Sequence, residues 1–254
     1  MGKVLILTEK PSQARDFARA LKNCRQREGY YDCGDYIITW ALGHLFEIDD
    51  SIAPKRWSLE TLPIFPEKFK LKLRRGAGKQ FKVIKKLLKE ADKVVLAVDP
   101  GREGELLGRE ILLMAGWKDW DRTYRFWTSE ALTPEVVRRG LKNLKPIKEF
   151  DSLYYSALAR QHGDWIVGIN LTRLTTLKSS DRSVWSVGRV QTPTLKLIVD
   201  REREIENFKP EEYWVIKATF QKGDFKYEGT LLRDKKLAQK LFEELDKEEL
   251  PEED

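Results

Sequence analysis

Two runs of consecutive apolar residues lie in the first hundred positions, Val4-Leu5-Ile6-Leu7 and Val94-Val95-Leu96-Ala97-Val98. Both are too short for a helical repeat, and neither alternates with polar residues. Continuous apolar runs of this length are typical of strands that are buried on both faces inside a parallel sheet. We therefore predict buried strands over residues 3–8 and 94–98.

Helical periodicity follows each predicted strand. After Pro11, with Ser12 as a cap, apolar residues recur along one helix face, and residues 105–114 form a second helical stretch. The order strand, helix, strand, helix predicts an α/β domain with a largely parallel sheet.

Further strands are predicted from shorter patterns. Residues 36–40 and 45–48 are strand-like, and strict alternation over residues 68–74 predicts a half-buried strand with one basic face. Alternation returns from Tyr213 onward, which predicts strands near the end of the chain.

The segment between these strands is predicted to be mainly helical, over residues 134–206. Thr133 before Pro134 marks its start, because Thr can cap a helix and Pro suits the first helical position. The pair at positions 192–193, again Thr-Pro, is predicted to open the last helix.

Charge adds a candidate partner to this picture. The chain carries a net charge of +6, and residues 233–254 hold nine acidic and five basic side chains, a net charge of −4, which leaves +10 on the first 232 residues. A basic body favours a polyanionic partner. An ordinary solvated surface explains the charge alone equally well.

Cys24 and Cys33 are the only cysteines, and no further Cys or His cluster completes a zinc site. We expect them to be buried or indifferent thiols. No apolar run approaches the ~18 residues of a membrane-spanning helix, and the N-terminus lacks the pattern of a signal peptide. We therefore expect a cytoplasmic protein with no membrane partner.

Acidic side chains follow both buried strands: Glu9 the first, Asp99 and Glu103 the second. Functional groups gather at the carboxyl ends of parallel strands, so the three carboxylates converge if the strands are neighbours. Three carboxylates repel one another unless a cation joins them, and Mg²⁺ is the natural candidate. The alternative is a set of surface acids in two turns.

The segments around these acids resemble a known family. Thr8-Glu9-Lys10-Pro11-Ser12, followed much later by Asp-Pro-Gly-Arg-Glu-Gly-Glu at 99–105, is similar to the Toprim domain of type IA DNA topoisomerases, especially the topoisomerase III branch. The resemblance implies that Glu9 acts in acid/base chemistry at the scissile phosphate, with Lys10 as an auxiliary cation. It also implies that Mg²⁺ is bound by Glu9, Asp99 and Glu103.

Gly101 departs from the family pattern, Asp-x-Asp-x-Glu, in which the middle residue is an aspartate. One carboxylate fewer removes a ligand and a negative charge, so weaker Mg²⁺ binding is expected. The sequence leaves open whether Glu105, one turn further on, compensates.

A second stretch, Ser186–Leu195, is similar to the most characteristic segment of the same family. Physically it is a loop of small residues that opens a helix, where backbone N–H groups and the helix dipole favour a phosphate. Gly43-His44-Leu45 and residues 159–173 also resemble family segments near single-stranded DNA. The DNA contacts implied by the resemblance are His44, Arg160, His162, Asn170, Arg173, Ser186, Val187, Gly188, Arg189, Val190 and Gln191.

The resemblance, which covers residues 3–220, implies an N-terminal portion of such an enzyme with three parts. These are a Toprim catalytic domain over 1–150, part of a helical single-strand-binding domain over 151–210, and the start of a β-rich arch domain over 211–254. The implied reaction is cleavage, passage and religation of DNA strands without ATP, and no nucleotide-binding loop such as G-x-x-x-x-G-K-[ST] is found in the sequence.

Family members join DNA covalently to a tyrosine in an aromatic-x-Tyr-x-Arg-Thr context. None of the eight tyrosines here has that context. We therefore expect no nucleophile in this chain, and no relaxation of DNA by the chain alone.

Two other interpretations stay open. Primases and some nucleases share the Toprim core, but they do not account for Ser186–Leu195. A non-catalytic single-strand DNA-binding protein with a degenerate metal site accounts for Gly101.

Overall fold

A computed structural model describes residues 2–181, 183–220 and 225–245, with the backbone alone for residues 216–220, 225–231 and 245. Two compact units make up the chain, Met1–Thr192 and Pro193–Asp254. No helix in the described ranges is long and apolar enough to cross a membrane.

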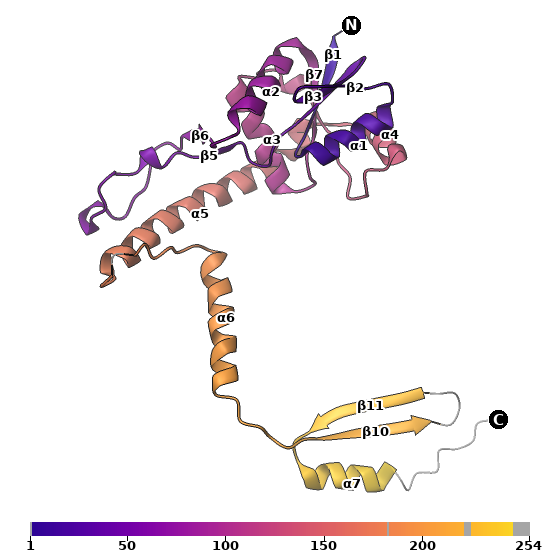
Figure 1. The fold of residues 1–254 in the computed structure, drawn as a ribbon, viewed down its shortest axis with the longest axis vertical. Coiled ribbons are helices and arrows are strands. Elements are labelled where there is room, and N and C mark those ends of the chain that lie inside the picture. Colours follow the sequence, from indigo (N-terminus) through magenta and orange to yellow (C-terminus); the bar gives the residue numbers. More distant parts are fainter. Residues whose placement is uncertain (1, 182, 221–224, 246–254) are drawn as a thin grey trace, which may run out of the picture. The chain divides into compact units, whose positions relative to one another are not determined.

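A seven-stranded sheet forms the centre of the first unit, in the order β2-β3-β4-β1-β7-β8-β9 (Figure 1). The strands are β1 (Lys3–Thr8), β2 (Arg25–Arg27), β3 (Tyr30–Cys33), β4 (Tyr36–Trp40), β7 (Ala91–Ala97), β8 (Thr123–Arg125) and β9 (Lys145–Pro146). The central strands β4, β1, β7 and β8 are parallel, and the outer pairings are antiparallel. This confirms the α/β class and the largely parallel centre of the sheet.

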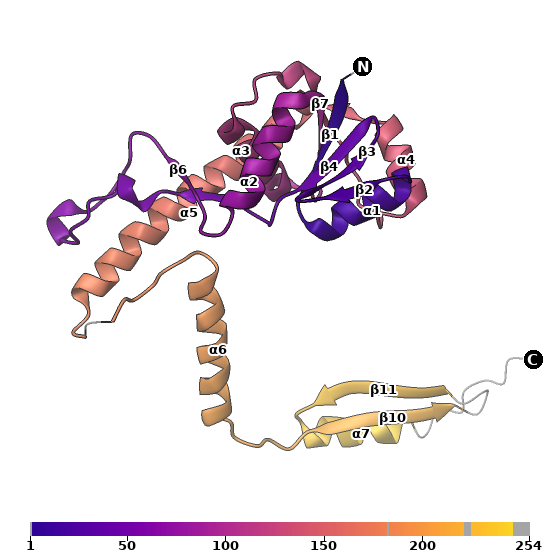
Figure 2. The same cartoon turned by 45° about the horizontal axis from the view of Figure 1, so that its top comes forward.

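Helices cover both faces of the sheet (Figure 2). α1 (Pro11–Leu21) and α4 (Pro134–Lys142) pack on one face, and α2 (Gly78–Glu90) and α3 (Arg102–Ala115) pack on the other. Leu5 and Leu7 of β1 belong to one core, whereas Ile6 belongs to the other. Burial on both faces explains why the strand shows no polar alternation.

The start of α4 was predicted correctly, whereas the predicted Ser12 cap was wrong, because α1 begins at Pro11 with Lys10 as its N-cap. The Thr133 side chain accepts a hydrogen bond from the backbone N–H of Val136 at 3.3 Å, and Pro134 occupies the first turn of α4. α3 begins at Arg102, three residues before the predicted start. β7 also begins three residues before its predicted start, at Ala91.

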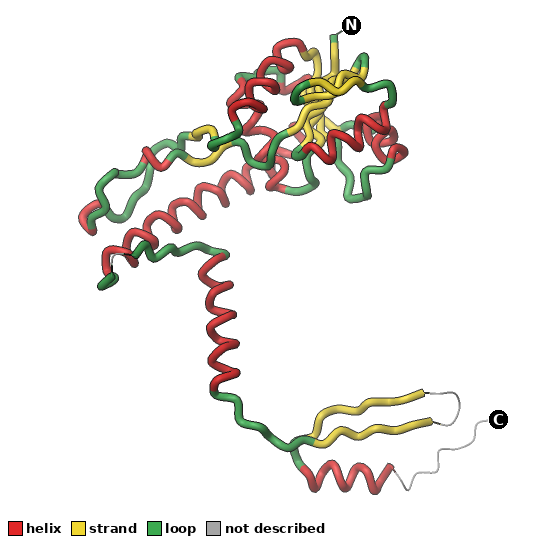
Figure 3. The backbone as a smooth tube through the Cα atoms, in the orientation of Figure 1, coloured by secondary structure: helices red, strands yellow, loops and turns green. Residues whose placement is uncertain are grey.

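α5 (Asp151–Lys178) is a 28-residue helix, and the long loop between β5 (Phe46–Ile48) and β6 (Leu71–Leu73) runs beside it (Figures 1 and 3). β5 and β6 form an antiparallel sheet of their own. Only residues 71–73 of the predicted strand over 68–74 are in strand conformation, because β5 offers just three pairing residues. Short 3₁₀ helices lie at Asp50–Ile52, Leu59–Thr61, Trp120–Arg122 and Ile147–Phe150.

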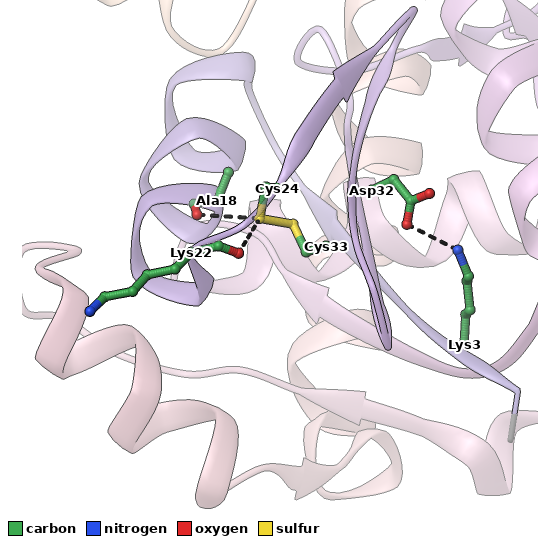
Figure 4. Close-up of a disulfide and its surroundings, with 6 residues drawn as sticks. All are labelled: Lys3, Ala18, Lys22, Cys24, Asp32 and Cys33. Carbon is green, nitrogen blue, oxygen red and sulfur yellow. Dashed lines mark hydrogen bonds and ion pairs between the residues drawn. A yellow bond between two sulfur atoms is a disulfide. The ribbon is translucent and has the colours of Figure 1, made fainter.

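Cys24 and Cys33 form a disulfide, so the expectation of two unlinked thiols was wrong (Figure 4). β2 and β3 make an antiparallel hairpin in which Arg25 is opposite Asp32. The next positions outward are the two cysteines, whose Cα atoms are 4.1 Å apart. The spacing of the cysteines alone does not reveal this hairpin register, which ties the end of α1 to the edge of the sheet.

The second unit contains β10 (Trp214–Phe220), β11 (Phe225–Leu232) and α7 (Lys235–Leu245). β10 and β11 are antiparallel, which agrees with the strands expected from Tyr213. α6 (Gln191–Glu206) begins one residue before the predicted Thr-Pro start. Residues 246–254 of the predicted third domain lie outside the described residues, and the predicted domain limits at 150 and 210 stay predictions.

Candidate active site and nucleic-acid groove

The carboxyl ends of β1 and β7 lie side by side, with Thr8 opposite Ala97. From this point α1 leaves toward one face of the sheet and α3 toward the other, and such switch points are where open sheets bind ligands. Glu9 and Asp99 meet here, because the backbone N–H of Asp99 donates to Glu9 Oε2 at 3.2 Å. The structure therefore brings together two of the three predicted acids.

Asp99 carries two further partners from α1 and the residue before it. Lys10 Nζ lies 3.2 Å from Asp99 Oδ2, and the side-chain amide of Gln13 donates to Asp99 Oδ1. Gln13 Oε1 accepts from the backbone N–H of Glu9 at 3.1 Å. Gln13 thus links both acids, although nothing in its sequence context indicates a role.

Glu103, the third predicted acid, faces α5 instead. Arg160 Nη1 donates to Glu103 Oε1 at 2.8 Å. Among the described residues, no group of three His, Cys, Asp or Glu side chains lies close enough to hold a metal ion. Carboxylates suit Mg²⁺ in kind, but Asp99 and Glu103 each face a cationic side chain. The residues as placed do not form a ready three-carboxylate site.

Gly101 has a backbone conformation that disfavours the aspartate of the family pattern. Its φ is 133°, a conformation that residues with a Cβ rarely adopt. Gly104 is also constrained, since an added Cβ would lie 2.3 Å from the carbonyl oxygen of Asp99. Restoring an aspartate at 101 would therefore strain the turn.

Glu105 does not compensate for the missing acid. It is fully buried, and its two oxygens accept from Arg109 Nε and Arg125 Nε, both at 2.9 Å. The sequence does not show whether Glu105 replaces the missing ligand, and its burial between two arginines shows that it does not.

Arg125 holds the loop that carries Asp99. Its guanidinium donates to the carbonyl oxygens of Val98 at 2.9 Å and Asp99 at 2.8 Å. Burial lowers the pKa of Arg125, while the adjacent Glu105 carboxylate opposes that shift. Arg125 was not among the predicted site residues, because a sequence does not distinguish a buried arginine from an exposed one.

His44 stands between the acids and a buried glutamate. The backbone N–H of Gly43 donates to the Glu9 carbonyl at 3.2 Å, which places the turn. His44 Nδ1 lies 3.7 Å from Glu110 Oε2. The hydrogen bond with Glu110 raises the pKa of His44, burial opposes it, and the charges of Glu103 and Glu9 add to the rise.

A hollow of ≈ 490 Å³ opens beside these residues, against α5. Its polar and aromatic lining consists of His44, Arg74, Arg160, Gln161 and Trp165, together with the acids Glu47, Asp50, Glu103 and Asp164. Cationic and aromatic groups together suit a nucleic-acid strand, since the first contact phosphates and the second stack on bases. We call this hollow the acid-end groove.

The predicted loop over 186–191 folds back on α5. Arg189 donates to both oxygens of Asp164, at 2.7 and 3.1 Å, which raises the pKa of Arg189 and lowers that of Asp164. Within the loop, Gln191 Nε2 donates to Ser186 Oγ at 2.7 Å. Val190 and Gly188 belong to the same exposed or half-exposed turn before α6.

Three other predicted DNA contacts have definite places on α5. The ring of His162 stacks on Phe69 with centroids 3.7 Å apart, and burial lowers its pKa. Asn170 accepts from the N–H of Ile64 at 2.6 Å and donates to its carbonyl at 2.9 Å, so its amide holds the β5–β6 loop. Arg173 is buried under that loop.

Known proteins are similar to this chain in sequence. A family model described as "Toprim domain" matches residues 4–130, and one described as "DNA topoisomerase" matches residues 148–252. "DNA topoisomerase 3" of Staphylococcus aureus strain USA300 is 44% identical over 235 residues, 89% of this chain and 32% of that protein. "Putative DNA topoisomerase 3" of the bovine strain RF122 matches with the same identity and coverage. The chain thus spans about a third of the length of these curated relatives.

A solved structure is also similar. Full-length topoisomerase I from Thermotoga maritima matches with a TM-score of 0.58 and 27% sequence identity, over 93% of this chain and 37% of that chain.

Proposed function

The chain belongs to the type IA DNA topoisomerase family, and from this premise we propose that it holds a single strand of DNA along α5 and presents one phosphodiester to Glu9 and Lys10. The observation that carries the proposal is the acid-end groove, where Arg74, Arg160 and Trp165 line the same hollow as Glu103. His44 lines this groove, and the charges of Glu103 and Glu9 add to the rise of its pKa that the hydrogen bond with Glu110 causes.

The proposed reaction is ATP-independent cleavage, passage and religation of a DNA strand. A tyrosine hydroxyl attacks phosphorus and releases its proton to water, the bond from phosphorus to the 3′ oxygen breaks, and Glu9 supplies the proton that the leaving oxygen takes up. Religation returns that proton to Glu9. Lys10 stabilises negative charge on the phosphate, since its ammonium already lies beside an anion, Asp99 Oδ2.

Mg²⁺, when bound, would add positive charge at the phosphate, held by Glu9, Asp99 and Glu103. Because Asp99 faces Lys10 and Glu103 faces Arg160, we expect weak binding by the free protein. None of the reaction steps proposed above is assigned to the ion.

We propose that none of the tyrosines of this sequence is the nucleophile, because none lies in the aromatic-x-Tyr-x-Arg-Thr context of the family. Among the tyrosines whose side chains the structure describes, Tyr154 is the one with a clear pKa shift, and its burial raises that pKa. This is the opposite of what activates a phenol as a nucleophile. We therefore expect no relaxation of supercoiled DNA by this chain alone.

A second candidate function is non-catalytic binding of single-stranded DNA. The positive φ of Gly101, which disfavours an aspartate at this position, favours it, together with the cationic partners of Asp99 and Glu103. Calorimetric titration with Mg²⁺, with and without a bound oligonucleotide, separates the two. Heat that appears only in the wild type and is lost in Asp99→Ala supports the metal site, and absence of heat under both conditions favours simple binding.

DNA binding itself is tested by fluorescence anisotropy with a labelled oligonucleotide, single-stranded or annealed. We expect tighter binding of the single strand, strong salt dependence, and weaker binding by Arg189→Ala. Arg122→Ala is the matched control. Arg122 immediately precedes β8 and therefore lies at the amino ends of the parallel strands, whereas the acids lie at their carboxyl ends. Equal affinity for duplex and single strand, with no effect of Arg189→Ala, would contradict the groove assignment.

A further inference from the structure

A hollow of ≈ 490 Å³ lies between the end of α1 and α4, and we call it the α1–α4 hollow. It is lined by Leu21, the last residue of α1, by Tyr36, the first residue of β4, and by Leu141 of α4. Because β4 begins here and runs parallel to β1, the hollow lies at the amino ends of the central strands. Glu9 and Asp99 lie at the opposite, carboxyl ends.

The floor of the hollow is the margin of a hydrophobic core. Leu21, Tyr36 and Leu141 are partly buried and pack against the cluster that contains Ile6 and Phe17. Single exposed apolar side chains are ordinary on protein surfaces, but here three of them share one hollow. A partner that covers them removes apolar surface from water, which favours binding.

The rim of the hollow is cationic, with Arg138, Arg139 and Lys142 of α4. Arg138 Nη1 donates to the carbonyl oxygen of Ala20 at 3.0 Å, so its guanidinium is fixed at the end of α1. Arg139 pairs with Glu130. Among the described residues, no acid pairs with Arg138 or Lys142. Two cations of the rim are therefore open to an anionic group from outside.

The lining stays positive when its acid is counted. Glu135 is the acid among the lining residues, against three cations. The exposed neighbours Lys22 and Asp35, which flank lining residues, offset each other. Cations near the C-terminal end of a helix also offset its dipole, and Arg138 does this for α1. A guanidinium has five N–H donors, so this contact leaves others for a ligand.

The wall that the end of α1 forms is held from two sides. The disulfide of Cys24 and Cys33 fastens the segment after α1 to β3 (Figure 4). The hydrogen bond from Arg138 to Ala20 fastens α1 to α4. A hollow with fixed walls loses little conformational entropy when a partner binds.

We propose that the α1–α4 hollow docks an acidic peptide segment of a partner protein. Two carboxylates of the peptide bind Arg138 and Lys142 by charge-assisted hydrogen bonds, and an apolar side chain between them covers the floor. The spacing agrees, because Arg138 and Lys142 are four residues apart on α4, about 6 Å along the helix axis. Alternate residues of an extended peptide are about 6.6 Å apart, and the residue between them points to the other side.

The apolar floor favours a peptide over a strand of nucleic acid. A strand supplies phosphates for the rim, but its bases stack on open aromatic faces. Tyr36 is the aromatic residue of the lining, and its ring packs against the core. The proposal goes beyond DNA binding and does not depend on it, because the hollow and the acids lie at opposite ends of the strands.

Fluorescence anisotropy with a labelled peptide of alternating aspartate and leucine tests the docking site. Lys142→Glu reverses a charge at the rim and should raise the dissociation constant about tenfold. Lys118→Glu is the matched control, because it makes the same change of charge on an exposed side chain just after α3, which covers the other face of the sheet. Its dissociation constant should stay within about twofold of the wild type.

Changes in the peptide supply a second measurement that leaves the protein unaltered. Alanine in place of leucine removes the contact with the floor and should weaken binding about tenfold. Lysine in place of aspartate places cations at a cationic rim and should abolish binding.

Several results would overturn the proposal. Absence of peptide binding by the wild type is one, and equal losses in Lys142→Glu and Lys118→Glu, which would mean that overall charge alone attracts the peptide, are another. Equal binding of the leucine and alanine peptides would show that the floor makes no contact. Displacement of the peptide by an unlabelled single-stranded oligonucleotide would assign the hollow to nucleic acid.

The DNA proposal is tested separately from this one. Arg189→Ala should weaken binding of the oligonucleotide and leave binding of the peptide unchanged, since Arg189 pairs with Asp164 on α5. Lys142→Glu should do the reverse. A failure of either proposal is therefore recognised without reference to the other.

Discussion

Two hollows adjoin on α5: the acid-end groove and the Arg173 pocket, which is lined by Trp57, Trp165 and Arg173 among others. They differ in how their cationic side chains are paired. At the acid end, each cation named here has an anionic partner: Lys10 with Asp99, Arg160 with Glu103, and Arg189 with Asp164. In the Arg173 pocket a buried guanidinium has a tryptophan face and no hydrogen-bonded anion among the described residues.

The difference bears on how a strand of DNA would bind. At the acid end a phosphate has to replace a carboxylate that is already paired, so the net gain is small and sensitive to salt.

The largest expected effect concerns the support beneath the acid end. Arg125→Met leaves the buried Glu105 without one of its two arginines and frees the carbonyl groups of the Asp99 loop. We expect a loss of about 3–5 kcal/mol in the free energy of unfolding, measured by urea denaturation. The double variant Glu105→Gln/Arg125→Met removes both charges and should lose clearly less. Equal losses would mean that the pair does not act as a unit.

A smaller effect tests whether the ion pairs of the acid end oppose DNA. Glu103→Gln releases Arg160 and removes a negative charge from the groove. Because both side chains are partly exposed, we expect only a two- to fivefold tightening for single-stranded DNA, about 0.4–1 kcal/mol. Asp121→Asn, at the opposite edge of the sheet, is the control. Weaker binding by Glu103→Gln would reverse the comparison between the two hollows.

The smallest effect is a pH dependence with opposite signs at the two histidines of the chain. The pKa of His44 is raised by Glu110, so its contribution is fully present below the unfolded pKa of about 6.5 and is lost as pH rises through the folded pKa. The pKa of His162 is lowered by burial, so its charging disfavours folding as pH falls through about 6.5.

Chemical denaturation between pH 5 and 8 measures both contributions. His44→Gln should lose stability mainly near pH 5, by less than about 1 kcal/mol because His44 is partly exposed. His162→Gln should improve stability at low pH relative to the wild type. The same sign for both variants would show that the charges around the groove are not arranged as described.

Local sequence was sufficient for the elements that bound the site. β1 occupies the predicted residues 3–8, and Thr133 caps α4 as its context indicates. The two acids at the ends of β1 and β7 could also be predicted to meet, because neighbouring parallel strands end at one edge. Each of these inferences needs only a strand or helix period and one rule of sheet topology.

The partners of charged side chains could not be predicted in this way. Glu103 and Arg160 are 57 residues apart in sequence, and the contact follows from the packing of α3 against α5. The disulfide was missed for a similar reason, since the register of the β2–β3 hairpin decides it.

The sequence by itself determined the buried strands, the start of α4, the order of the motifs and hence the family. These depend on neighbours within a few positions, which any reader of the chain can see. Only the tertiary structure decided that Glu105 is locked beneath the site, that Gly101 bends the backbone, and that Arg173 is buried without an acceptor. The physical reason is that hydrogen bonds and ion pairs act over about 3 Å, and only folding brings distant residues that close.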